Sequence, residues 1–358
     1  MLFRSAIVLA GFAALGAMAL LISKDTVRDA TIASIRDVTG LELVLRGDVT
    51  VSLFPTGSVT FANVALGNNR TPVMAADQLT ARLRFFPLFA GRIEIADVSL
   101  AAPRINISYD KDGRSNWGAL IDTLARAIGP NAGRPTNASS FSEIRINGGV
   151  ITINDAASGG VEVFRNVEMA LAWPSISKSF AATGRFSWRN ETIDAAVSFS
   201  DFAAALAGDR SGLKVRLGGT PLKFAFDGSW STRPTLKIEG TLAADTASLR
   251  DALRWAGLKP LSNSGFGRFA LKAKTNVSGG TIGLSAVNIE LDGNVAEGVL
   301  TFATDGRQTL QGTLAADEIN LTPYLTNFQM LASNERDWSW TPLELDGLTG
   351  FDLDLRLD

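Results

Sequence analysis

The sequence of 358 residues contains no cysteine and no histidine. Without cysteine, neither a disulfide framework nor thiol chemistry is available to the chain. The lack of histidine removes the commonest general base and the commonest zinc ligand. Charge is nearly balanced, with 34 Lys and Arg against 36 Asp and Glu, so bulk charge does not favour nucleic acid. We therefore expect no cofactor, no metal ion and no nucleic-acid partner.

The first 24 residues carry a long uncharged run. After Arg4, the nineteen residues from Ser5 to Ser23 contain no charge, and charges resume at Lys24. As a helix this run spans roughly 28 Å, close to the hydrocarbon core of a bilayer. We predict a transmembrane anchor over residues 1–24, with Arg4 on the cytoplasmic side. A cleaved secretory signal is the alternative, with 17–19 (Ala-Met-Ala) as the cleavage site, and both interpretations export the remainder.

The exported part divides at residues 129–140, a small, polar stretch with two prolines that is typical of a linker or long loop. Residues 25–128 precede it, and apolar spacing there predicts one helix from about Asp25 to Thr39 and a second over 117–128. Residues 141–358 follow it and show almost only the two-residue period of strands. We expect two exported regions, an N-terminal β domain with two helices and a longer sheet of repeated hairpins.

The sheet prediction depends on apolar residues that alternate with polar ones, because alternate strand residues point to the same face. The sequence GTLAAD occurs at 240–245 and again at 312–317, within similar strand–turn–strand units. After residue 140, short helices are expected only over 202–206 and 249–256. The predicted fold class is mainly β: an N-terminal transmembrane helix, then an elongated, curved, mostly antiparallel sheet with a few short helices.

The residues that could carry chemistry are better explained by structural roles, such as turns and exposed strand positions, than by catalysis or metal binding. The sequence of 110–113, Asp-Lys-Asp-Gly, lacks the glycine and glutamate spacing of a calcium loop and predicts a polar turn. Asp352, Asp354 and Asp358 alternate with leucines, which places them on the solvent face of a strand. A serine triad would lack its histidine, although the residue types leave serine–lysine hydrolysis open. We expect that the protein is not an enzyme.

The N-terminal third resembles the AsmA family. The resemblance rests on the segment GDVTVSLFP at 47–55, LGN at 66–68, PLFAGRIEI at 87–95, PRIN at 103–106 and DGRSNW at 112–117, in this order behind an N-terminal anchor. The resemblance implies an inner-membrane protein with a single span and its body in the periplasm. It also implies a role in outer-membrane assembly and, as for several relatives, in the transport of phospholipid.

The larger family members resemble curved β-sheets with an apolar inner groove. The sequence leaves open whether the apolar strand faces here form such a groove or a closed core. If they form a groove, the residues expected to line it are Val49, Val51, Leu53, Ile93, Ile95, Phe186, Trp188, Val197, Phe199, Leu236, Ile238, Phe351, Leu353 and Leu355. The alternative function is an assembly factor that regulates protein targeting to the outer membrane by binding strands at an open sheet edge.

A compact apolar cluster around Pro87 has two interpretations. It could form a buried turn between strands, or it could dock on the membrane with arginines placed for lipid headgroups. The second interpretation predicts a membrane-proximal patch made of Phe85, Phe86, Leu88, Phe89, Arg82 and Arg84. The expected partners are thus the membrane itself, phospholipid, and outer-membrane proteins or their assembly machinery.

Overall fold

The structure, a computed structural model, describes residues 43–52, 57–68, 71–84, 94–122, 143–172, 179–258, 265–303, 308–325 and 351–357, with six positions between 25 and 36. The predicted anchor over 1–24 and the linker over 129–140 lie outside these residues. Within the described ranges, no helix is both long and apolar enough to cross a bilayer. The six positions between Asp25 and Arg36 are helical, as predicted, and the second predicted helix is present at 118–122.

The prediction of a mainly β fold with a few short helices is confirmed, and 18 strands are described. Contacts divide the chain into two compact units, Met1–Trp188 and Arg189–Asp358. Both short helices predicted after residue 140 are present, as α5 (Phe202–Ala207) and α6 (Leu249–Trp255). The turn at 110–113 is also present, because the Asp110 carboxylate accepts hydrogen bonds from the backbone N–H groups of Asp112 and Arg114.

The first unit is a mixed sheet around the strands β3 and β4. β1 and β2 each pair with β3 in antiparallel fashion, β3 pairs with β4, and β4 pairs with both β5 and β6. β5 and β6 both run parallel to β7, which continues into antiparallel β8 and β9. The strands are β1 Leu43–Leu45, β2 Val49–Ser52, β3 Ser58–Asn68, β4 Thr71–Leu83, β5 Ile95–Ala101, β6 Arg104–Tyr109, β7 Glu143–Asp155, β8 Gly160–Ala172 and β9 Phe180–Trp188.

One face of the first unit is a closed core. Val59 and Phe61 of β3 are completely buried, and their cross-strand partners Ala81 and Leu79 of β4 are almost completely buried. The same cluster continues to Leu100 of β5 and to residues of β7 and β8. Apolar side chains here are thus removed from water as in an ordinary domain interior.

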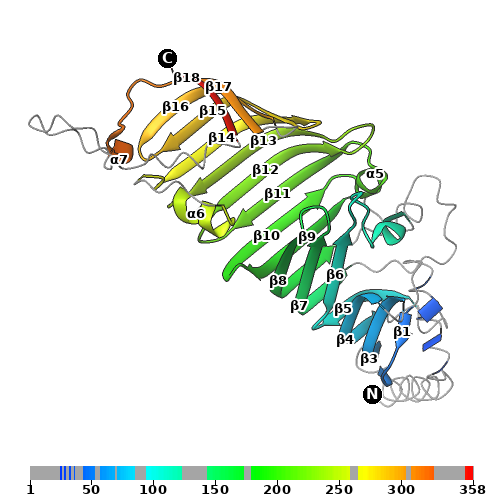
Figure 1. The fold of residues 1–358 in the computed structure, drawn as a ribbon. Coiled ribbons are helices and arrows are strands. Elements are labelled where there is room, and N and C mark those ends of the chain that lie inside the picture. Colours follow the sequence, from blue (N-terminus) through cyan, green and yellow to red (C-terminus); the bar gives the residue numbers. More distant parts are fainter. Residues whose placement is uncertain are drawn as a thin grey trace, which may run out of the picture. The chain divides into compact units, whose positions relative to one another are not determined.

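The second unit follows chain order from strand to strand (Figure 1). All neighbours from β10 to β17 pair in antiparallel fashion, and β18 runs parallel to β17. Apart from α5 and α6, a single turn of helix, α7 (Thr322–Leu325), precedes β18. The strands are β10 Glu191–Phe199, β11 Ser211–Gly218, β12 Lys223–Ser231, β13 Lys237–Thr246, β14 Phe269–Ser278, β15 Thr281–Leu291, β16 Asn294–Ala303, β17 Gln308–Ala315 and β18 Phe351–Leu357.

Bulges keep the apolar residues on one face where the sequence departs from the two-residue period. In β15, Leu284 and Val287 are three residues apart, and the register shifts between them around Ala286, whose φ is +47°. β8 shows the same device at Asn166, with φ +50° between Arg165 and Glu168. An extra residue in one strand restores the phase of the side chains that follow it. The long strands therefore remain amphipathic along their whole length.

Candidate functional site

The described strands of the second unit share one apolar face. Cross-strand registers place Val215, Phe226, Leu242 and Ala273 side by side in a row over β11 to β14. The same alternation continues over all nine strands, and we call this surface the apolar face. Its members are Ala195, Val197, Phe199, Leu213, Val215, Leu217, Phe224, Phe226, Trp230, Ile238, Leu242, Ala244, Leu271, Ala273, Val277, Ile282, Leu284, Val287, Ile289, Ala296, Leu300, Phe302, Leu310, Leu314, Leu353, Leu355 and Leu357.

The opposite face of the same strands is polar. Its charges are partly paired across strands, with Lys214 Nζ 2.8 Å from the Asp227 carboxylate and Arg210 Nη2 3.2 Å from that of Glu239. Both members of each pair are exposed, so water already solvates them and the pairs contribute little to stability. The sheet thus separates an apolar side from a hydrated side over its full extent.

No second layer covers the apolar face among the described residues. Every extensive contact between strands of this unit joins hydrogen-bonded neighbours, and α5 adds a small contact with β11. Consequently most large side chains on the apolar face remain partly exposed, whereas the first unit contains a larger cluster of buried side chains around Val59 and Phe61. Leu353 and Leu357, on β18, are 59% and 60% exposed. The face also contains a buried cluster, formed by Ala273, Val287, Leu300 and Leu314. Around this cluster, most of its large apolar side chains are only partly buried.

Two facing glycines on the apolar face make room for an aromatic ring. Gly228 and Gly240 lie opposite each other on β12 and β13, and the ring of Phe226 folds over both. A Cβ atom built on either glycine would lie within 2.8 Å of the Phe226 Cζ atom. Beside Gly240 lies Thr275 of β14, whose buried Oγ1 has no hydrogen-bond partner in the described structure. The Phe226 ring thus fills the space above both glycines, and the surroundings are apolar apart from one buried hydroxyl group.

Aromatic side chains lie over the apolar face at one end of the strands. α5 follows the C-terminal end of β10, and α6 follows that of β13. Because these two strands run in opposite directions, the helices lie at opposite ends of the strands. At the α5 end, the Phe199 ring is 6.2 Å from that of Phe202 and 5.5 Å from that of Trp230, centroid to centroid. Phe202 thus carries α5 against the end of the apolar face.

A polar and aromatic cluster lies at the turn between β15 and β16. The Asp292 carboxylate accepts hydrogen bonds from the Tyr324 hydroxyl at 2.6 Å and from the backbone N–H groups of Phe266 and Gly267. The Arg250 guanidinium lies 5.7 Å from the Phe266 ring centroid. Burial, followed by the hydrogen bond and charge of Asp292, raises the pKa of the Tyr324 hydroxyl above its ordinary value. This cluster fixes α7 to the turn between β15 and β16.

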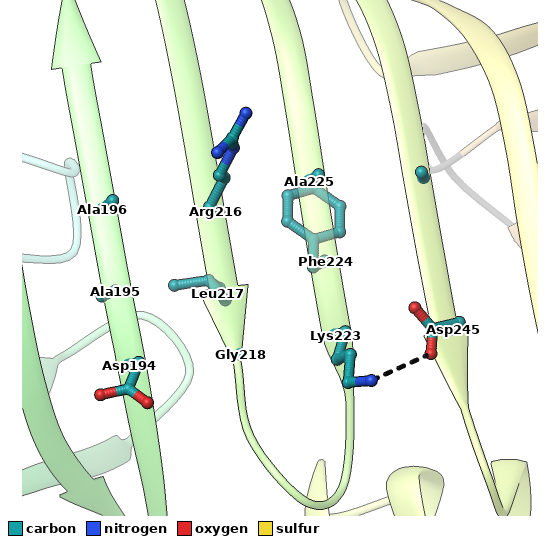
Figure 2. Close-up of a pocket in the computed structure, with 11 residues that line it drawn as sticks. Asp194, Ala195, Ala196, Arg216, Leu217, Gly218, Lys223, Phe224, Ala225 and Asp245 are labelled. Atoms are coloured by element: carbon teal, nitrogen blue, oxygen red, sulfur yellow. Dashed lines mark ion pairs between the residues drawn. The ribbon is translucent and has the colours of Figure 1, made fainter.

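A hollow of about 400 Å³ lies against the polar face near the β11–β12 turn (Figure 2). Ala196, Ala225 and Ala243, from three strands, contribute small side chains to it. Charged groups surround these alanines, including Lys223, whose Nζ is 4.0 Å from the carboxylate of Asp245. The hollow brings together no arrangement of nucleophile and base, and the described residues contain no cluster of three acidic side chains that could bind a metal.

The structure separates the residues expected to line a groove. In the first unit, Ile95 is buried in the closed core, and Val49, Val51 and Phe186 pack against it. Trp188 stacks near Phe164 and donates from Nε1 to the Glu162 carboxylate at 2.7 Å. Leu53 and Ile93 lie outside the described residues. These positions contribute to packing within the first unit.

The other expected residues belong to the second unit. Val197, Phe199, Ile238, Leu353 and Leu355 lie on the apolar face, and Phe351 begins the strand β18. Leu236 precedes β13 and is exposed. The predicted groove lining included no residue of β11, β12 or β14 to β17, although the alternation of these strands was readable in segments such as LKVRL at 213–217.

The expected membrane-proximal patch is described only at its arginines. Phe85, Phe86, Leu88 and Phe89 lie outside the described residues. The Arg82 Nε atom donates to the Asp97 carboxylate at 2.7 Å, and the Arg84 backbone N–H donates to the Glu94 carbonyl. Arg82 is therefore held on the sheet by an ion pair.

Comparison with known proteins identifies the family. A protein-family model described as the AsmA family matches residues 2–323. Searches of curated proteins and of solved structures find no match. The family match covers the first unit and most of the second, and it extends well beyond the segments in which the sequence showed its resemblance.

Proposed function

The chain belongs to the AsmA family, and we propose that it holds or conducts phospholipid along the apolar face of its second unit. In this proposal the protein is anchored in the inner membrane, its body lies in the periplasm, and it serves outer-membrane biogenesis. The role is non-enzymatic, because shielding acyl chains from water requires no reacting group.

The observation that carries the proposal is the uncovered apolar face. Nine described strands present apolar residues on one side, and the described residues provide no layer that packs on them. Exposed apolar surface on this scale marks a binding surface in soluble proteins. An acyl chain suits it, because each CH₂ group removed from water stabilises binding by about 0.8 kcal/mol.

The geometry also supports an amphiphilic ligand rather than a fully apolar one. The described residues form a single layer here, so a charged headgroup could stay hydrated while its acyl chains lie on the sheet. Burying an ionised headgroup instead would cost several kcal/mol.

Lipid analysis of the purified full chain tests the proposal. Leu242→Asp places a carboxylate in the middle of the apolar face, and Thr241→Asp places the same group one residue away, on the polar face. Acyl chains over Leu242→Asp would strip water from the charge, at a cost of several kcal/mol. We expect stoichiometric phospholipid above annular background with the wild type and with Thr241→Asp, and at least tenfold less with Leu242→Asp.

Circular dichroism of the three proteins provides the folding control for this comparison. Equal amounts of lipid on all three correctly folded proteins would contradict the proposal. So would the absence of lipid above a control protein that carries the same anchor.

A further inference from the structure

One hydroxyl group on the apolar face has no hydrogen-bond partner. Thr275 of β14 shares this face with Ala273 and Val277, which lie two residues away on either side, and it is only 8% exposed. Its Oγ1 atom is buried and makes no hydrogen bond to the described residues. Most buried hydroxyl groups in proteins have a partner, because removing an unpaired one from water costs free energy. The Thr275 hydroxyl is therefore a candidate contact for a ligand atom.

The neighbours of Thr275 offer it no side-chain group for a hydrogen bond. Thr275 lies opposite Gly240 of β13 on one side and opposite Leu284 of β15 on the other. Gly240 in turn lies opposite Gly228 of β12. Two successive strands beside the hydroxyl thus carry no side chain at this level, and the Phe226 ring fills the space above them. The hydroxyl and the two glycines form one row across three strands.

A turn of the Phe226 ring gives a ligand access to this row. The Cζ atom of the ring lies within 2.8 Å of the position that a Cβ of either glycine would take, so the ring occupies their side-chain space. No second layer of described residues lies above the ring. Rotation about its Cα–Cβ bond to another staggered position can therefore carry the ring outward without displacing another element. An acyl chain then takes its place above the glycines, beside Thr275.

The surroundings decide which lipid atom the hydroxyl binds. A threonine hydroxyl can donate one hydrogen bond, and hydrocarbon offers no acceptor. An ionised phosphate is an acceptor, but bringing it onto an apolar floor would remove it from water at high cost. An ester carbonyl is neutral and is attached directly to the acyl chain. We propose that Thr275 donates a hydrogen bond from Oγ1 to an acyl-ester carbonyl of the bound phospholipid, with Phe226 turned outward.

This inference rests on the proposed function, and it specifies ester-linked lipids as the preferred ligand. Competition between ester-linked and ether-linked phosphatidylcholine with the same chains tests it, because the two lipids differ only at the carbonyl groups. The full chain in detergent receives both lipids in equal amounts, and mass spectrometry identifies the bound lipid. We expect the wild type to prefer the ester by about fivefold, as one hydrogen bond of ordinary net strength gives.

The variants assign this preference to the hydroxyl group. Thr275→Val should bind both lipids equally, whereas Thr275→Ser retains the hydroxyl and should retain the preference. Thr241→Val removes a threonine hydroxyl from the polar face and is the matched control, with the preference of the wild type. Because Thr275→Val removes an unpaired buried group, it should fold at least as stably as the wild type. A lost preference in this variant is therefore not explained by misfolding.

The role of the ring is tested by Phe226→Leu, which shortens the side chain above the glycines. Its preference for the ester should be at least as large as that of the wild type, and a smaller one would overturn the inference. Equal binding of the two lipids by the wild type, or an unchanged preference in Thr275→Val, would also overturn it and leave the proposed function standing. Binding of neither lipid would contradict the proposed function itself, and this inference with it.

Discussion

Replacing one leucine in each unit by alanine compares a closed core with an open face. Leu79 is 4% exposed and lies between Phe61 and Leu100 in the first unit. Leu242 is partly exposed and lies between Phe226 and Ala273 in the second unit. The chemical change is identical at the two positions, so the difference in stability reports how completely each side chain is covered.

The expected magnitudes differ severalfold. Leu79→Ala leaves a cavity among buried side chains, so it should lower the free energy of unfolding by about 3–4 kcal/mol. Leu242→Ala removes a side chain that already contacts water and leaves no enclosed cavity. We therefore expect the free energy of unfolding to fall by only about 1 kcal/mol. In units of this size 1 kcal/mol shifts Tm by about 2–4 °C. Leu79→Ala should therefore lower the melting temperature of its unit by about 10 °C, and Leu242→Ala that of its own by about 3 °C.

Differential scanning calorimetry of the full chain, after exchange of bound lipid for detergent, measures both shifts. The reasoning would be refuted by equal losses in the two variants. That result would mean that the apolar face is covered as tightly as the core of the first unit, and would leave no open surface for a ligand.

Three further substitutions test local features of the second unit. Gly240→Val should markedly lower its melting temperature, because a Cβ there would lie 2.5 Å from the Asp227 carbonyl oxygen. Thr275→Val should raise stability by about 1 kcal/mol in a denaturant titration, since it removes a buried hydroxyl without a partner. Tyr324 is held un-ionised in the folded state by burial and by Asp292, whereas in the unfolded chain it ionises near pH 10. The contribution of Tyr324 to stability is therefore complete below about pH 10 and is lost above it. The melting temperature should fall more steeply from pH 8 to 11 for the wild type than for Tyr324→Phe.

The two-residue period was sufficient to predict strands but not to follow them through bulges. Val59 and Phe61 alternate with polar neighbours and lie in β3, and Ile105 and Ile107 do the same in β6. The spacing of three between Leu284 and Val287 breaks the period, and only the left-handed residue Ala286 restores it. Such positions depend on the pairing strand, which a single sequence does not identify.

The sequence predicts that the strands have an apolar face, but it identifies only some of the residues on the uncovered face of the second unit. Alternation shows that Ile95 and Val197 each sit on an apolar face, but it does not show what packs above them. Ile95 is enclosed by other strands of the first unit, whereas Val197 has no described layer above it. Whether an apolar strand face becomes a core or a binding surface depends on tertiary contacts that alternation does not encode.

Photo-crosslinking in intact cells tests the central claim most directly. A benzophenone amino acid replaces Val197, Leu242 or Leu284 on the apolar face, and in matched variants their neighbours Ser198, Ala243 or Ser285 on the polar face. The full chain is produced in cells labelled with [³²P]phosphate and irradiated. The account predicts labelled phospholipid attached at the three apolar positions and none at their polar neighbours; equal labelling of both sets, or labelling of neither, would contradict it.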